Sequence, residues 1–153
     1  MNPQEPWPTD LKETRSADSG ARVIAFVTDF MIVAALALVG TAIWATITPA
    51  PEDPEQRADR LVTGAYIAYV IVGAVYSVVS VTLWGQTPAK RFMNLKIVGS
   101  DGFRPTFNRA VGRHAASYLS LFFFIGYMMG LIRRDQRALH DLMAGTWVVR
   151  KPG

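Results

Sequence analysis

The chain has 153 residues, half of them apolar, and a formal net charge of +4. This length suggests a single domain, and the absence of cysteine excludes a disulfide framework and a cysteine-ligated metal site. Most basic residues lie at the ends of apolar blocks, where membrane topology explains them, so the charge favours anionic lipid over nucleic acid as a partner.

The chain begins with a polar, proline-containing stretch over residues 1–20, which we expect to be a disordered cytoplasmic tail. An apolar block follows over residues 23–47. About 20 helical residues cross the ~30 Å hydrocarbon core of a bilayer, so this block predicts a transmembrane helix. It is too long for the apolar part of a cleavable signal, and we expect it to remain uncleaved.

A second transmembrane helix is predicted over residues 61–83. The connection before it, TPAPEDPEQRADR, is acidic and rich in proline, whereas the opposite flanks of both helices are basic. Cytoplasmic loops carry the excess of Lys and Arg. The sequence therefore predicts an external connection and a cytoplasmic N-terminus, 84–112 loop and C-terminal tail.

Three strand-like segments are found outside the two long blocks. Residues 94–98 (NLKIV) and 103–107 flank an Asp-Gly turn signal, which predicts a hairpin, and residues 146–150 (TWVVR) supply a third strand. A lone hairpin is marginal in water. We therefore expect the three segments to form one small cytoplasmic β element.

A third membrane segment is predicted over residues 110–132, which contain Gly126 and Gly130. If it spans once, the basic C-terminal tail lies outside, against the charge rule. A re-entrant segment keeps the tail inside, and the charge count favours it; a simple third span is the alternative. The predicted fold class is an all-α membrane protein with two transmembrane helices, a third spanning or re-entrant segment and a small cytoplasmic β element.

Three motifs occur in order along the chain. Arg22 precedes Asp29 in the first helix, GQTPAK (85–90) follows the second, and RALHDLMAGTWVV (137–149) lies near the end. Together they resemble the RDD family of small bacterial membrane proteins, named for one arginine and two aspartates. By motif position the second aspartate is Asp141.

The resemblance covers about residues 20–150, with the membrane domain over 21–150. One departure is Ala89, which stands where the family's G-x-TPGK element has glycine. The resemblance implies a multi-pass protein of the bacterial inner (cytoplasmic) membrane. For some relatives it also implies monovalent-cation/proton exchange.

Asp29 is an ionisable residue in an apolar helix, about two turns from Arg22 on the same face. A charged side chain at the bilayer centre costs about 2.5–3.5 kcal/mol on insertion scales, so Asp29 needs a partner or a proton. Arg113 and His114 are candidate partners of Asp29, and His140 is a further possible partner of the motif residues. Three interpretations stay open: a structural pair that fixes helix packing, a protonatable transport carboxylate, and a neutral carboxyl held by hydrogen bonds.

Arg22 is interpreted as an anchor on phosphate headgroups or as a partner of Asp29 or Asp141. His140 and Asp141 are adjacent, and neighbours on a helix point about 100° apart, so they do not form a relay with each other. No serine or cysteine nucleophile is evident nearby, which argues against catalysis. We expect Asp141 to accept hydrogen bonds from backbone N–H groups or an arginine and to lock the tail against the membrane domain.

The remaining motifs predict neither nucleotide, cofactor nor metal. GQTPAK lacks the spacing of a phosphate-binding loop, and two histidines with scattered acids make a poor metal set. Four basic residues near the ends of the apolar blocks are expected to contact anionic lipid headgroups: Lys90, Arg91, Arg133 and Arg134.

Two functions are consistent with these features. The first is a non-enzymatic accessory or scaffold component of a membrane assembly, in contact with another membrane protein or with itself. The alternative is an oligomeric monovalent-cation/proton transporter in which Asp29 titrates. Three membrane segments are too few to enclose a pathway alone, so a transporter would have to oligomerise.

Overall fold

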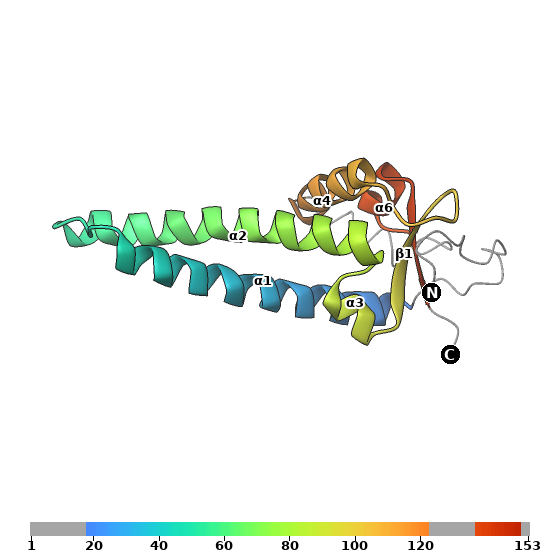
Figure 1. The fold of residues 1–153 in the computed structure, drawn as a ribbon, viewed down its shortest axis with the longest axis horizontal. Helices are drawn as coiled ribbons and strands as arrows, with labels where there is room; N and C mark the ends of the chain where they lie inside the picture. The colour runs from blue at the N-terminus through green and yellow to red at the C-terminus, as the bar shows by residue number, and fades with distance from the viewer. Residues whose placement is uncertain (1–17, 123–136, 151–153) are drawn as a thin grey trace.

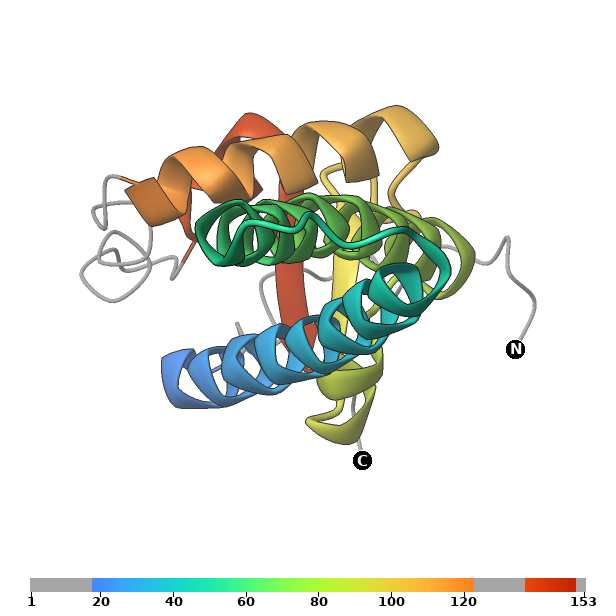
Figure 2. The same cartoon turned by 90° about the vertical axis from the view of Figure 1, so that its left-hand side faces the viewer.

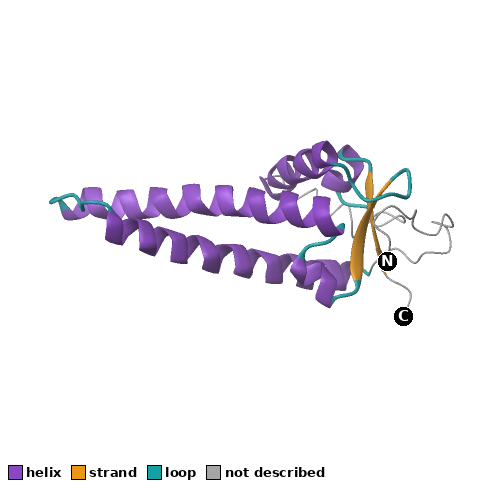
Figure 3. Ribbon diagram, in the orientation of Figure 1, coloured by secondary structure: helices purple, strands orange, loops and turns teal. Residues whose placement is uncertain are grey.

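The computed structural model describes residues 18–122 and 137–150. A long hairpin of two antiparallel helices dominates it (Figure 1): α1 (Ser19–Ile47) and α2 (Pro54–Trp84). The other elements form a small head at one end of this hairpin (Figure 3). They are α3 (Pro88–Phe92), β1 (Leu95–Gly99), α4 (Phe107–Phe122), α6 (Leu139–Met143) and β2 (Thr146–Arg150).

Both long helices are long and apolar enough to cross a membrane, over Gly20–Ile47 and Pro54–Trp84. Each begins earlier than its apolar run. In α2 the reason is a cap, because the Asp53 carboxylate accepts the N–H of Glu55 at 3.0 Å and proline suits the first helical turn. The acidic stretch predicted as a loop is therefore partly helical.

The two long helices pack through small residues of α2. A β-carbon on Gly64 would lie 2.8 Å from the Trp44 ring, and one on Gly73 would lie 3.4 Å from Val33. The small-residue face is thus used within the hairpin. Only 17% of the apolar window of either helix is buried, so the outward faces present apolar side chains to their surroundings.

The sheet of the head has two antiparallel strands. Leu95 lies opposite Arg150, and Gly99 lies opposite Thr146. The strands predicted at 94–98 and 146–150 are therefore direct neighbours. Figure 3 shows the pair lying across the end of the hairpin.

The predicted return strand over residues 103–107 is wrong. Gly99 N–H donates to the carbonyl of Phe103 at 2.7 Å, and Asp101 accepts the N–H of Phe103 at 3.1 Å. These contacts close a compact loop around the Asp-Gly pair, and Phe107 already begins α4. The position beside β1 is occupied instead by β2, from the far end of the chain.

α4 crosses the end of the hairpin instead of running beside it, as Figures 1 and 2 show together. Its buried residues Ala110, Arg113 and Ala116 recur on one face, and the helix packs against α2 and α6. The predicted third membrane segment covers residues 110–132, and its part beyond residue 122 lies outside the described residues. A third span is not seen in the described part.

Gly85 turns the chain from α2 into the head. Its φ is +67°, and its carbonyl accepts the N–H of Ile97 at 2.7 Å. We expect Gly85→Ala to lower the free energy of unfolding by about 1–2 kcal/mol, because a β-carbon is strained in the left-handed region.

The matched control is Gly112→Ala on α4, where a β-carbon would meet nothing within 4 Å. Here we expect a gain of about 0.5–1 kcal/mol, because alanine favours the helix. Thermal unfolding in detergent micelles, followed by circular dichroism, measures both. Equal shifts in the two variants would contradict the role given to Gly85.

Candidate functional site

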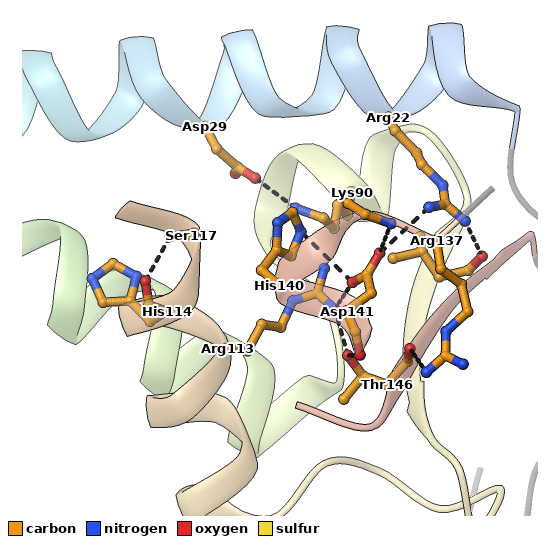
Figure 4. A network of polar contacts seen from close by, with 12 residues as sticks. Arg22, Asp29, Lys90, Arg113, His114, Ser117, Arg137, His140, Asp141 and Thr146 are labelled. Atoms are coloured by element: carbon orange, nitrogen blue, oxygen red, sulfur yellow. Dashed lines mark hydrogen bonds and ion pairs between the residues drawn. The ribbon is translucent and has the colours of Figure 1, made fainter. Parts of the chain in front are cut away.

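The motif residues Arg22, Asp29 and Asp141 meet their candidate partners where the hairpin joins the head (Figure 4). They form two neighbouring clusters, one around Asp141 of α6 and one around Asp29 of α1. Six elements contribute side chains, namely α1, α2, α3, α4, α6 and β2, so neither cluster is complete until the head has docked on the hairpin.

Asp141 is 1% exposed and is held by two arginines. Arg113 Nη1 donates to Oδ1, and Arg22 Nη1 donates to Oδ2 at 3.5 Å. The N–H of Ala138 also donates to Oδ2, at 3.3 Å. Burial alone would raise the pKa of the Asp141 carboxyl, but Arg113, His140 and Arg22 outweigh it and hold the pKa below its usual value. The carboxylate is therefore ionised.

The same arginines also bind β2. Arg113 Nη1 donates to the hydroxyl of Thr146 at 2.7 Å, and Arg22 Nη2 donates to the carbonyl of Val148 at 2.9 Å. Arg137 Nη2 donates to the carbonyl of Thr146 at 3.2 Å. The network thus ties the start of α1, α4 and α6 to one strand. This arrangement confirms the expected contact of Asp141 with a backbone N–H and an arginine.

Asp29 is held by three donors from α2, the loop after it and α3. Tyr76 donates its hydroxyl to Oδ1 at 2.6 Å, Thr87 donates its hydroxyl to Oδ2 at 2.6 Å, and the Lys90 ammonium lies 3.3 Å from Oδ2. The Lys90 side chain is only 16% exposed. Burial lowers the pKa of Lys90, and the Asp29 carboxylate offsets part of that effect.

A cavity of about 140 Å³ lies beside Asp29. Polar groups from both clusters line it together with aromatic side chains: Asp29, Lys90, Arg113, His114, Tyr118 and His140. Nε2 of His114 is buried with no hydrogen-bond partner among the described residues. The cavity has room for several water molecules.

Two expected contacts of the site are corrected. Arg113 and His114 line the cavity of Asp29, but Arg113 binds Asp141, because α4 crosses the hairpin and directs this side chain toward α6. Lys90 was expected at lipid headgroups. It pairs with Asp29 instead, because α3 folds back against α1.

The other predicted site residues are placed as follows. Arg22 pairs with Asp141, one of its two predicted carboxylates. His140 Nε2 lies 3.6 Å from Asp141 Oδ1, too far for a hydrogen bond, so the two form no relay. Arg91 is exposed. Arg133 and Arg134 lie outside the described residues.

Sequence reasoning missed three hydroxyl groups of the site, those of Tyr76, Thr87 and Thr146. Only Thr87 carries a local signal, because threonine before proline is typical of a helix start, and its hydroxyl caps α3. Among the described residues, no group of three or more His, Cys, Asp or Glu is placed to hold a metal ion.

His140 gives the site a pH dependence. Burial, reinforced by Arg113, lowers the pKa of its imidazole from 6.5 to about 4. Between pH 6.5 and about pH 4, His140 is protonated in the unfolded chain but neutral in the folded protein, so a lower pH favours unfolding. We expect the free energy of unfolding to fall by about 3 kcal/mol as the pH drops through this window. Asp141, with its lowered pKa, adds a further loss only in stronger acid.

Denaturant unfolding in micelles at a series of pH values measures this slope. His140→Asn is expected to remove the larger part of it, whereas the matched control His114→Asn is expected to keep the larger part. Identical slopes in the two variants would show that His140 is not the group responsible.

Two helices that are long and apolar enough to cross a bilayer form a hairpin, and internal ion pairs hold the head at one end of it. This arrangement is typical of a helical membrane protein. Residues 16–145 match the RDD family, and the chain belongs to this family of small bacterial membrane proteins. The expected resemblance is thereby confirmed.

Two relatives are themselves uncharacterized. The chain is 32% identical over 91 residues to an uncharacterized protein of Haemophilus influenzae, covering 56% of this chain and 58% of that one. It is 31% identical over 86 residues to the uncharacterized protein YxaI of Bacillus subtilis, covering 56% of each. The match thus spans little more than half the length of these relatives. No solved structure matches.

Proposed function

We propose that this protein is a non-enzymatic accessory or scaffold component of an assembly in the bacterial inner membrane. The observation that supports this proposal is the contact between the family residues Arg22 and Asp141, together with the hydrogen bond of Arg22 to Val148 of β2. Residues that make such contacts stabilise the fold. Their side chains are not left available for a substrate.

In this proposal the protein is multi-pass and the head faces the cytoplasm. Basic residues gather at the head, whereas four of the five acids of the hairpin lie at its other end, in the connection and the first turns of α2: Glu52, Asp53, Glu55 and Asp59. This asymmetry fits the positive-inside rule. The contact of Arg22 with Val148 puts the start of α1 and β2 at the same end, which fits a third segment that returns to the side from which it entered.

The surface proposed for a partner is the outward face of the hairpin. Large apolar side chains are exposed along both helices, such as Met31 and Leu38 on α1 and Tyr66 on α2. Membrane helices associate through close packing of such faces. The partner is another membrane protein or a further copy of this chain.

The test places a photo-crosslinking amino acid at Met31, Leu38 or Tyr66, one at a time, in cells. We expect at least one position to give a protein adduct of a single mass, and the same partner to stay at fixed stoichiometry in a mild detergent extract. Val33, which is buried against α2, is the control position. Adducts with lipid alone at all three exposed positions would contradict the proposal.

A second candidate function is exchange of a monovalent cation for protons by an oligomer. It is favoured by the cavity beside Asp29, which brings a carboxylate and polar groups together at the end of the hairpin. Here Asp29→Asn is expected to abolish pH-driven cation flux in proteoliposomes, and Asp101→Asn, at an exposed acid, is expected to preserve it. Flux that persists in Asp29→Asn would exclude this candidate.

A further inference from the structure

A second hollow lies at the corner between α2 and α3. Its volume is about 600 Å³. The lining residues come from one short stretch of chain: Trp84, Gln86, Thr87, Pro88, Arg91 and Phe92. We call this hollow the corner groove. It is separate from the cavity beside Asp29, although Thr87 lines both.

Two aromatic side chains mark the corner groove as a surface that meets lipid. Phe92 is 84% exposed, and Trp84 is 54% exposed. Trp84 is also the last residue of α2, one of the two helices apolar enough to cross a membrane. Tryptophan at such a helix end sits at the headgroup level of the bilayer. The corner groove therefore lies at the membrane–water interface.

Gln86 gives the corner groove an unsatisfied acceptor. The residue is 7% exposed, and its Oε1 is buried without a hydrogen-bond partner among the described residues. Buried polar atoms in folded proteins are nearly always paired. A molecule in the corner groove that carries a hydroxyl group would supply a donor for Oε1.

The charge around the corner groove is positive. Arg91 is exposed and is the charged residue of the lining, which contains no acid. Two more basic side chains reach the end of α2: a β-carbon on Gly85 would lie 3.3 Å from Lys96 Cε and 3.2 Å from Arg104 Cγ. An arginine fork suits a phosphate group, so the occupant carries negative charge.

We propose that the corner groove binds an anionic glycerophospholipid with hydroxyl groups on its headgroup, the chemistry of phosphatidylglycerol. Arg91 holds the phosphate, a headgroup hydroxyl donates to Gln86 Oε1, and Trp84 and Phe92 pack against the glycerol and the upper acyl chains. A choline headgroup has no donor for Gln86. This site is independent of the proposed function and holds for a scaffold and a transporter alike.

The test is native mass spectrometry of the full chain in detergent micelles, titrated with dioleoyl-phosphatidylglycerol or dioleoyl-phosphatidylcholine. We expect the first lipid to be retained about tenfold more tightly. Arg91→Gln and Gln86→Leu are each expected to weaken its binding about tenfold, because each removes one polar contact. The matched control, Arg150→Gln, removes one exposed charge from the sheet and is expected to change nothing.

Three results would overturn the proposal. They are equal retention of the two lipids, stronger retention of phosphatidylethanolamine than of phosphatidylglycerol when it is titrated in the same way, and equal losses in Arg91→Gln and Arg150→Gln. Competition by glycerol phosphate at the same concentration as the lipid would identify a site for a soluble phosphate compound instead.

A wild-type measurement keeps the test valid if a variant fails to fold. Brominated phosphatidylglycerol is expected to quench tryptophan fluorescence more than brominated phosphatidylcholine in liposomes, and the difference is expected to vanish in Trp84→Phe. Equal quenching by the two lipids in the wild-type protein would refute a selective site at Trp84.

Discussion

Asp141→Asn is expected to lower the free energy of unfolding by about 3–5 kcal/mol, the largest effect of any substitution proposed for this protein. The carboxylate is 1% exposed and compensates Arg113 and Arg22. Asparagine keeps the shape but removes the charge, so the guanidinium groups of the buried Arg113 and the partly buried Arg22 lose their counter-ion. Chemical unfolding of the purified chain in micelles measures the loss.

The matched control is Asp101→Asn. Asp101 also pairs with an arginine, Arg109, at 2.5 Å, but the two side chains are 44% and 34% exposed. Exposed pairs contribute about 0–1 kcal/mol, so this variant is expected to stay close to wild type. Similar losses of unfolding free energy in the two variants would mean that the contacts of Asp141 stabilise the fold no more than an exposed ion pair does.

A double variant separates the loss of the ion pair from the loss of packing. Asp141→Leu combined with Arg113→Met removes both charges together. It is expected to be more stable than Asp141→Asn alone, because breaking a buried pair costs more than replacing both partners by apolar groups. A double variant less stable than Asp141→Asn would show that Thr146 and the backbone contacts matter more than charge.

Asp29→Asn is expected to produce the second largest effect, a loss of about 2–4 kcal/mol. Its carboxylate accepts from two hydroxyl groups at 2.6 Å and faces the buried Lys90 ammonium. Asparagine keeps one acceptor oxygen and leaves the ammonium without a counter-charge. Unfolding in micelles at neutral pH measures the effect.

Lys90→Met provides the comparison for this cluster. On its own, Lys90→Met leaves Asp29 with the hydroxyl donors Tyr76 and Thr87. Combined with Asp29→Asn, it removes the ammonium group that would otherwise be buried without a counter-charge. We expect the double variant to be more stable than Asp29→Asn alone. If Asp29→Asn unfolds like wild type, the contact with Lys90 is not structural, and the titrating role of Asp29 gains support.

The parts of the fold that the sequence predicts are those with local causes. Length and apolarity place α1 and α2, because the bilayer thickness alone sets how many apolar residues a span needs. β-branched runs place the strands at 94–98 and 146–150. The Asp-Gly pair is an equally local signal, but the hairpin that it predicts does not form. The neighbour of β1 is instead a strand about fifty residues further along the chain.

The partners within the site could not be read from the sequence. The direction of Arg113 depends on how α4 crosses the hairpin, and the burial of Lys90 depends on α3 folding back against α1. Neither depends on residue type or spacing near the motif. The family motif identifies Arg22, Asp29 and Asp141, but their separation into two clusters is a property of the tertiary structure.

The sequence distances within the two clusters set an order of assembly during synthesis. Asp29 meets Tyr76 across 47 residues and Lys90 across 61, so its cluster closes soon after the hairpin has been inserted. Arg22 meets Asp141 across 119 residues and Val148 across 126, which requires nearly the whole chain. Until then the inserted hairpin carries an arginine without its final acceptors. A nascent chain halted before β2 therefore lacks the contact that joins Arg22 to the sheet.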